Sequence, residues 1–242
     1  MFLIDIRIIK NKQKFLNDKL KGYSLKGKDK KFDSKGKALS FSGCTIICKI
    51  PKDSKLSKKI SNIQALLKKF NPKRKYTYLP PSSFHMTVFD CCNASTKNTK
   101  YWPKGINENK NYKIISKELN KRIKNFNFPK KFNLKPKMLF GGYSIILEPF
   151  SNKDKKIIKN CRDNLSKLLK IKFENHKRYI FHITLAYILE KLNFSEIRKI
   201  CEQDKKLLNK FKKEYPKITL YNDEMTTFKN MYKFKSINLS SQ

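Results

Sequence analysis

Two histidines, His85 and His182, each follow a phenylalanine and precede a threonine by two positions, and the 242-residue chain has only one other histidine. An imidazole titrates at about pH 6.5, so one histidine can accept a proton while another donates one at the same pH. A threonine hydroxyl can donate a hydrogen bond to an anionic oxygen. The repeated Phe-His-x-Thr motif therefore offers the groups for general acid–base chemistry on an anionic centre, with Thr87 and Thr184 as its binding groups.

Both motifs lie in short apolar runs, over residues 84–89 and 180–187, that predict β-strands. Side chains two positions apart on a strand point to the same face. Each histidine would then share a face with its threonine. The apolar residues between them would turn toward a core: Phe84, Met86, Val88, Phe181, Ile183 and Leu185.

Matching segments precede the two motifs. Gly43 begins the run Gly-Cys-Thr-Ile-Ile before His85, and Gly142 begins Gly-Tyr-Ser-Ile-Ile before His182, at distances of 42 and 40 residues. The order strand, helix and His-x-Thr strand thus occurs twice. This repetition predicts two similar lobes that face each other across a cleft.

Each half carries an amphipathic helical pattern between its glycine and its histidine. In the first half, Ser54 is the predicted N-cap and Asn71 with Pro72 the stop; in the second, Ser151 or Asn152 opens the helix. A third helical pattern, over residues 197–211, ends at Pro216 and precedes two short predicted strands near 218–221 and 225–235.

The chain resembles the two-histidine (2H, LigT-like) phosphoesterase superfamily and, within it, an uncharacterised cyclic-phosphodiesterase-like family. The resemblance implies an α+β, bilobal fold, with two pseudo-symmetric lobes whose antiparallel sheets face a central cleft and whose helices lie outside. Cys44 departs from the family pattern, which has Asn after the glycine. The resemblance covers roughly residues 32–237 and rests on Lys31–Gly36, Gly43–Ile46, Leu79–Asp90, Trp102–Pro103, Tyr179–Tyr187 and Thr227–Met231.

What the resemblance implies is a metal-independent phosphodiesterase without a cofactor, acting on nucleotide phosphodiesters that adjoin a ribose 2′-oxygen. These are 2′,3′-cyclic phosphates, 2′,5′-oligonucleotides or cyclic dinucleotide messengers. His85 and His182 would serve as acid and base, in either order, and Thr87 and Thr184 would hold the non-bridging oxygens. Two alternatives remain open: an RNA 2′,5′-ligase that uses the same four residues, and a non-catalytic basic RNA-binding protein on the same fold.

Substrate recognition would require aromatic faces near the cleft on which a base can stack. Phe89 lies four positions from His85 and so on the same predicted strand face. Tyr179 and Tyr187 lie an odd number of positions from His182, on the opposite face unless a bulge or the strand end reorients them. Trp102 and Arg178 complete the predicted substrate-binding set, Arg178 as a partner for a second phosphate.

A metal site is the competing interpretation, since two histidines and six cysteines could be ligands. Their spacings do not fit one: Cys44 and Cys48 have no second pair, Cys91 and Cys92 are adjacent, and Cys161 and Cys201 fall on apolar helix faces. We therefore expect no metal and free thiols.

Without a secretory signal or a membrane-length apolar run, we expect no membrane association and a cytoplasmic location, in the source cell or in an infected host cell.

The composition predicts one bilobal domain over residues 38–242, with lobe one at about 38–100, a connector at about 101–135 and lobe two at about 136–242. Residues 1–37 form a basic extension, the end of which is a possible flap over the cleft. A monomer is expected.

The formal net charge of +38 would attract a nucleotide or oligonucleotide substrate, and possible RNA binding through the basic surface follows from it. Lysines outnumber arginines by 51 to six, which is also typical of an A/T-biased genome. The forked arginine guanidinium is the group expected of a surface built to hold phosphates. The charge alone therefore does not decide between the two explanations.

Overall fold

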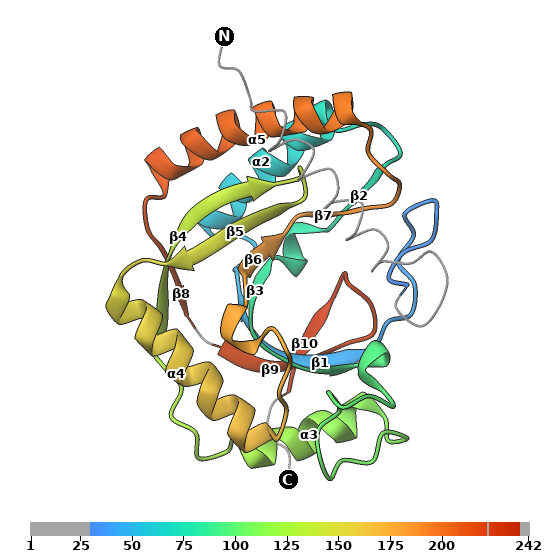
Figure 1. Ribbon diagram of the computed structural model, residues 1–242, viewed down its shortest axis with the longest axis vertical. Helices are drawn as coiled ribbons and strands as arrows, with labels where there is room; N and C mark the ends of the chain where they lie inside the picture. The colour runs from blue at the N-terminus through green and yellow to red at the C-terminus, as the bar shows by residue number, and fades with distance from the viewer. Residues whose placement is uncertain (1–29, 222, 238–242) are drawn as a thin grey trace.

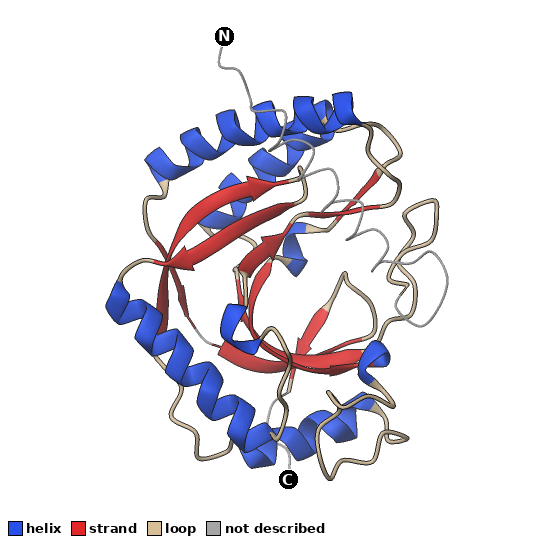
Figure 2. Cartoon of the chain, in the orientation of Figure 1, coloured by secondary structure: helices blue, strands red, loops and turns tan. Residues whose placement is uncertain are grey.

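The computed structural model describes residues 30–221 and 223–237, and an eight-stranded antiparallel sheet that curls into a half-barrel dominates them (Figures 1 and 2). The strand order is β10-β9-β1-β3-β6-β5-β4-β8. A separate two-stranded sheet pairs β2 (Tyr76–Tyr78) with β7 (Ala186–Ile188). The strands of the large sheet are β1 (Gly43–Lys49), β3 (His85–Asn93), β4 (Lys131–Phe140), β5 (Ser144–Pro149), β6 (Phe181–Thr184), β8 (Ile218–Tyr221), β9 (Asp223–Phe228) and β10 (Phe234–Ser236).

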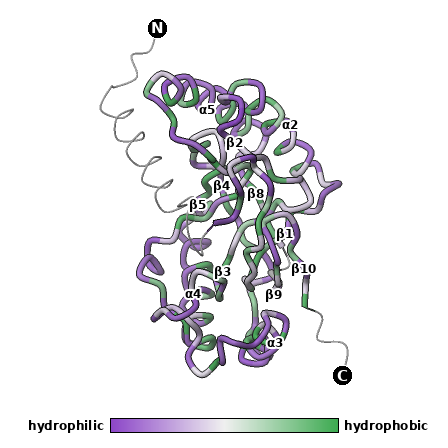
Figure 3. The backbone as a smooth tube through the Cα atoms, turned by 90° about the vertical axis from the view of Figure 1, so that its right-hand side faces the viewer, coloured by the Kyte–Doolittle hydropathy of each residue, from purple (hydrophilic) through white to green (hydrophobic). Residues whose placement is uncertain are grey.

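The described α-helices lie in two pairs at opposite ends of the molecule (Figure 1). One pair is α2 (Lys55–Phe70) with α5 (Phe194–Glu214), which pack on each other and, through α5, on β4. The other is α3 (Tyr112–Arg122) with α4 (Asn152–Leu169), which lie against β9, β3 and β5. Hydrophilic and hydrophobic residues alternate along these helices, so each buries one face and exposes the other (Figure 3).

The predicted helix boundaries are confirmed. The Ser54 side chain accepts a hydrogen bond from the Ser57 backbone N–H at the start of α2, and the helix ends before Asn71. Ser151 rather than Asn152 caps α4, accepting from the Asp154 backbone N–H at 3.2 Å. These side-chain oxygens satisfy backbone donors that the first helical turn leaves without partners.

The predicted repeat is visible in the sheet, where the three neighbouring strands β9, β1 and β3 on one side correspond to β4, β5 and β6 on the other. Two features differ from the expected lobes. The half-sheets are continuous rather than separate, because β3 pairs with β6 at Met86 and Ile183. Strand β9 pairs with β1, and β10 pairs with β9, so residues 223–236 complete the first half and not lobe two. Such long-range pairing leaves no local signal in the sequence.

The expected alternation along the two motif strands is confirmed. Met86, Val88 and Ile183 are fully buried, whereas each motif histidine and threonine is partly exposed. The apolar side chains join one large core that includes residues of both halves of the sheet. Burial of this face fixes the register of each strand, since a one-residue slip would turn the histidines into the core.

The described end of the N-terminal segment packs against the main domain. Phe32 forms an isolated bridge with Ala38 and is buried with Phe41 in a small apolar cluster that includes residues of the 228–231 region. Phe32, in the segment predicted as a possible flap, contacts Tyr187 of β7. The rest of the basic extension, residues 1–29, lies outside the described residues. Along the described chain, no helix has the length and apolar character needed to cross a bilayer.

A buried glutamine ties the two halves together from α2. The Gln64 Nε2 atom donates to the carbonyl oxygens of Leu79 and Leu185, both at 2.8 Å. Leu185 connects β6 to β7, and its carbonyl also accepts from the Leu79 backbone N–H at 2.9 Å. Gln64 thereby holds the segment that follows the second motif against the segment that precedes the first.

We expect Gln64→Met, which keeps the side-chain length but removes both donors, to lower the free energy of unfolding by about 1–3 kcal/mol, because two buried carbonyls lose a partner. Urea denaturation followed by circular dichroism measures this. Gln203→Met, at a half-buried position on α5, is the matched control and should change the unfolding free energy by less than about 0.5 kcal/mol. Equal effects of the two substitutions would contradict the role of Gln64.

Candidate active site

The pairing of β3 with β6 brings the two motifs into one site. Met86 lies opposite Ile183 in an antiparallel register. One position to either side, His85 therefore lies opposite Thr184, and Thr87 lies opposite His182. The four side chains form a square on the exposed face, with the two imidazoles at diagonal corners. Diagonal neighbours on adjacent strands lie about 7–8 Å apart, which leaves room for one phosphate between them.

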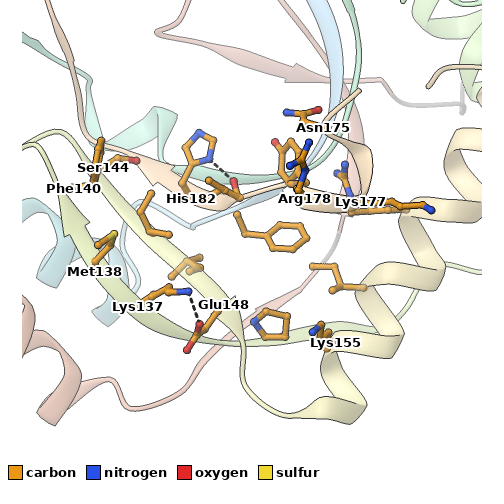
Figure 4. Close-up of a pocket in the computed structure, with 18 of the residues that line it drawn as sticks. Lys137, Met138, Phe140, Ser144, Glu148, Lys155, Asn175, Lys177, Arg178 and His182 are labelled. Carbon is orange, nitrogen blue, oxygen red and sulfur yellow. Dashed lines mark hydrogen bonds and ion pairs between the residues drawn. The ribbon is translucent and has the colours of Figure 1, made fainter. Parts of the chain in front are cut away.

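Both imidazoles are held in the same way. His85 Nδ1 lies 2.7 Å from the carbonyl oxygen of Ser83, and His182 Nδ1 lies 2.9 Å from that of Ile180. A carbonyl only accepts, so Nδ1 carries the proton in both rings and donates it. In both rings Nδ1 is therefore the atom that orients the imidazole, and Nε2 is the atom on the other side of the ring. Figure 4 shows this bond for His182 at the edge of a pocket.

The surroundings of His85 favour its neutral form. Its ring packs on that of Phe234 in β10, with ring centroids 4.3 Å apart. Desolvation by burial lowers the pKa of His85 to about 4, and the charges of His182 and Lys49 act in the same direction. Lys49 is itself paired with Glu224 at 2.6 Å. At neutral pH the His85 imidazole is therefore a base with a free Nε2 lone pair.

A cavity of about 730 Å³ opens beside the second motif. His182, Thr184 and Tyr187 line it together with residues of β5, of α4 and of the turn at His176–Arg178. Figure 4 shows His182 and this turn in the cavity wall. Arg178 and Tyr179, both predicted to bind substrate, also line it. The cavity thus gathers the second motif and three of the five predicted substrate-binding residues.

A bulge brings Tyr187 to this cavity. The backbone N–H groups of Leu185 and Ala186 both donate to the Tyr143 carbonyl, at 2.8 and 3.1 Å, so two residues on this strand face one on its neighbour. Such a bulge reverses the alternation of side chains. Tyr187 therefore joins the face of His182 and Thr184, as the sequence allowed only if the strand were reoriented. One side of its ring is covered by Phe32, at a centroid distance of 4.9 Å.

The predictions for Phe89 and Trp102 are wrong. A shift of register between β1 and β3 at Thr87–Phe89 turns Phe89 inward, where it is 1 % exposed and has no face for a base. Trp102 packs edge-on against Tyr112 of α3 and donates its indole N–H to the Ile106 carbonyl at 2.8 Å. Trp102 does not line the cavity. In both cases the residue type suited a stacking role, but the register shift at Phe89 and the packing of Trp102 on α3 depend on contacts that have no local signal in the sequence.

The remaining histidine of the chain, His176, is held by a carboxylate. Its Nε2 lies 2.8 Å from a carboxylate oxygen of Asp163 on α4, and its side chain is 9 % exposed. This contact fixes the turn that carries Lys177 and Arg178 along the cavity.

Sequence reasoning missed Arg162. It is 5 % exposed, its guanidinium lies 3.9 Å from the ring centroid of Tyr179, and its Nη1 atom donates to the carbonyl of Val88 at the β3 irregularity. Burial lowers the pKa of Arg162, and the negative charge of Asp90 opposes that effect. In the sequence of α4, Arg162 follows Cys161, which lies on the predicted apolar face of the helix. This neighbour was the only sign in the sequence that Arg162 is buried.

Arg162 and Tyr179 link the cavity wall to the first motif. Burial raises the pKa of Tyr179, and so do the charge of Asp90 and its hydrogen bonding with Tyr179, whereas the charge of Arg162 and hydrogen bonding with Thr87 have the opposite effect. The buried Tyr179 hydroxyl is therefore protonated at neutral pH and lies next to Thr87. Through this contact α4 and the second half of the chain help to position the threonine of the first motif.

The cysteines are structural. All six are free thiols and five of them are buried. Cys44 and Cys92 face each other across β1 and β3 with their Sγ atoms 3.4 Å apart, so Cys44 supplies no polar group to the cleft. Within the described ranges, no three His, Cys, Asp or Glu side chains are grouped to hold a metal ion.

Comparisons with known proteins agree with the fold and give a coarse family indication. The model of a family named 2H-phosphodiest, described as a domain of unknown function (DUF1868), matches residues 31–140. This range includes the first motif and ends before the second. No curated protein matches the chain.

The chain is similar in structure to the conserved protein of unknown function ATU0111 from Agrobacterium tumefaciens str. C58. The TM-score is 0.81 at 23 % sequence identity, over 86 % of this chain and 89 % of that one. The likeness spans both halves of the sheet and establishes a shared fold.

We expect the His85 imidazole to remain neutral down to about pH 5 in the folded protein, because its pKa of about 4 lies below the ordinary value of 6.5. Between these two values the unfolded chain binds more protons at this residue, so His85 makes the free energy of unfolding rise with pH. NMR titration of the imidazole resonances, assigned with His85→Ala, measures the midpoint. A midpoint at or above pH 6.5 would contradict the desolvated environment.

Proposed function

We propose that the chain is a 2H-type phosphodiesterase that cleaves nucleotide phosphodiesters adjoining a ribose 2′-oxygen without a metal ion. The observation that carries the proposal is the diagonal pair of imidazoles, each with Nδ1 bonded to the carbonyl two residues before it. In-line displacement at phosphorus needs a base on the attacking oxygen and an acid on the leaving oxygen, on opposite sides of one phosphate. The family indication for residues 31–140 supports the same reaction class.

In this proposal the surroundings of His85 assign the two roles, because its ring packs on Phe234 and is desolvated there, which favours the neutral imidazole. A neutral imidazole at pH 7 accepts a proton, so His85 is the base that removes the proton of the attacking hydroxyl. His182 then donates its Nε2 proton to the leaving oxygen. Each such transfer contributes roughly 100- to 10,000-fold in rate.

The hydroxyls at the other corners of the square would bind the non-bridging oxygens. Thr87 lies opposite His182, and Thr184 lies opposite His85, so each hydroxyl flanks the phosphate between the imidazoles. Hydrogen bonds to an anionic group contribute on the order of 1.5–3 kcal/mol each. These hydrogen bonds become stronger as negative charge develops on the non-bridging oxygens in the transition state, so they would contribute to catalysis as well as to binding.

We expect His85→Ala and His182→Ala each to lower kcat at least about 100-fold with the fold intact, because each removes one proton transfer. The assay uses 2′,3′-cyclic nucleotides, 2′,5′-oligoadenylates and cyclic dinucleotides with a chelator present, and circular dichroism checks folding. If the two groups act in one step, the double variant loses little more than either single one.

Multiplicative losses in the double variant would indicate independent roles and contradict the paired mechanism. Wild-type turnover in either single variant would overturn the site, and loss of activity on adding chelator would overturn the metal-independent reaction. A substrate panel with no turnover at all would overturn the proposed function for these phosphodiesters.

A further inference from the structure

The cavity beside His182 extends well beyond the four motif residues. At about 730 Å³ it is within the range of sites that enclose a whole small ligand. Its walls away from His182 are largely apolar and include Met138, Ile146, Pro149, Ile158 and Phe181. A phosphate between the imidazoles would occupy only one end of this space, so the apolar walls require another part of the ligand.

Cations surround this apolar interior. Lys155, Lys177 and Arg178 line the cavity from α4 and from the turn before β6, and all three are exposed (Figure 4). Within the described part of the chain, none of the three forms an ion pair with an acidic side chain.

The two carboxylates of the cavity are already engaged. Glu148 is paired with Lys137 at 3.3 Å, and Asp163 is paired with Lys159 and with His176, each at 2.8 Å. The positive charge of the three unpaired cations is therefore not neutralised by the cavity itself. An apolar interior with a cationic rim is complementary to a nucleotide, which has a flat base and an anionic phosphate.

The wall that carries two of these cations is held in place without a ligand. His176 anchors the turn to Asp163, and Arg162 packs on Tyr179 directly after it. Between this wall and His182, Ile180 is 57 % exposed and lines the cavity. A large apolar side chain that is kept exposed in a fixed wall offers a contact surface for a base or ribose.

We infer that this cavity binds the leaving nucleotide, so that the substrate is a phosphodiester between two nucleotides, with a further phosphate on the leaving side, and not a 2′,3′-cyclic mononucleotide. The inference rests on the proposed function, in which His182 is the acid. His182 protonates the leaving oxygen, and the cavity begins at His182 and not at His85. The group that departs is therefore the one that occupies the cavity.

The reaction balances on these groups. A ribose hydroxyl or water attacks phosphorus while its proton passes to His85 Nε2, and the bond from phosphorus to the leaving oxygen breaks as that oxygen takes the His182 proton. The leaving nucleotide departs with a free hydroxyl. Its next phosphate would lie at Lys155, Lys177 and Arg178, where exposed charge pairs contribute modestly, about 0.2–1 kcal/mol each.

The test compares 2′,5′-linked triadenylate with 2′,3′-cyclic AMP as substrates of the full chain. We expect the triple variant Lys155→Gln, Lys177→Gln and Arg178→Gln to lower kcat/KM for the triadenylate about tenfold, because three exposed contacts to phosphate are lost. The wild-type chain should turn over the cyclic mononucleotide much more slowly than the triadenylate. The triple variant should change that lower kcat/KM less than about twofold, because a mononucleotide has no further phosphate to meet the three cations. The matched control, Lys206→Gln, Lys210→Gln and Lys213→Gln on α5 at the other end of the molecule, should spare both substrates (Figure 1).

Binding of a phosphorothioate triadenylate, measured by calorimetry, separates failure of the subsite from failure of the enzyme. If both substrates turn over and the cavity variant affects them equally, or affects neither, the proposed function stands and the subsite is overturned. If nothing turns over but the analogue binds and the cavity variant weakens that binding about tenfold, the subsite stands and the proposed function fails. If the analogue neither binds nor reacts, both are overturned.

Discussion

The backbone pairing of Met86 with Ile183 is the contact on which the site depends. It joins the two half-sheets, and it sets the register in which His85 meets Thr184 and Thr87 meets His182. A shift of one residue would bury the imidazoles and expose the methionine and isoleucine. Because both of these apolar side chains are fully buried, the hydrophobic core that stabilises the fold also holds the four motif side chains in place.

The two halves are similar in backbone but differ in what surrounds each histidine. His85 lies under Phe234 and beside Lys49, which favours its neutral form, whereas His182 opens onto a cavity with a cationic rim. This difference matches the proposed roles, in which His85 accepts a proton and His182 donates one. The asymmetry comes from the elements that pack beside each motif: the C-terminal strand β10 on one side, and on the other α4 with the turn at His176–Arg178.

The sequence predicted the repeated unit because that unit is local. Alternation placed His85 and Thr87 on one face, and the caps at Ser54 and Ser151 fixed where the helices begin. It could not predict features that depend on distant parts of the chain. Such features are the pairing of β9 with β1 and of β10 with β9, the bulge that turns Tyr187 into the cavity, and the contact of Arg162 with Val88. Phe89 failed for the same reason, since simple alternation has no means of anticipating a change of register.

The central claim is that the two imidazoles act on one phosphate from opposite sides. A crystal structure with an inert phosphorothioate dinucleotide tests this most directly. The account predicts that His85 Nε2 and His182 Nε2 each lie within about 3.2 Å of oxygens on opposite sides of the same phosphorus, with the Thr87 and Thr184 hydroxyls on its non-bridging atoms. A phosphate bound by only one histidine, or bound away from both, would contradict it.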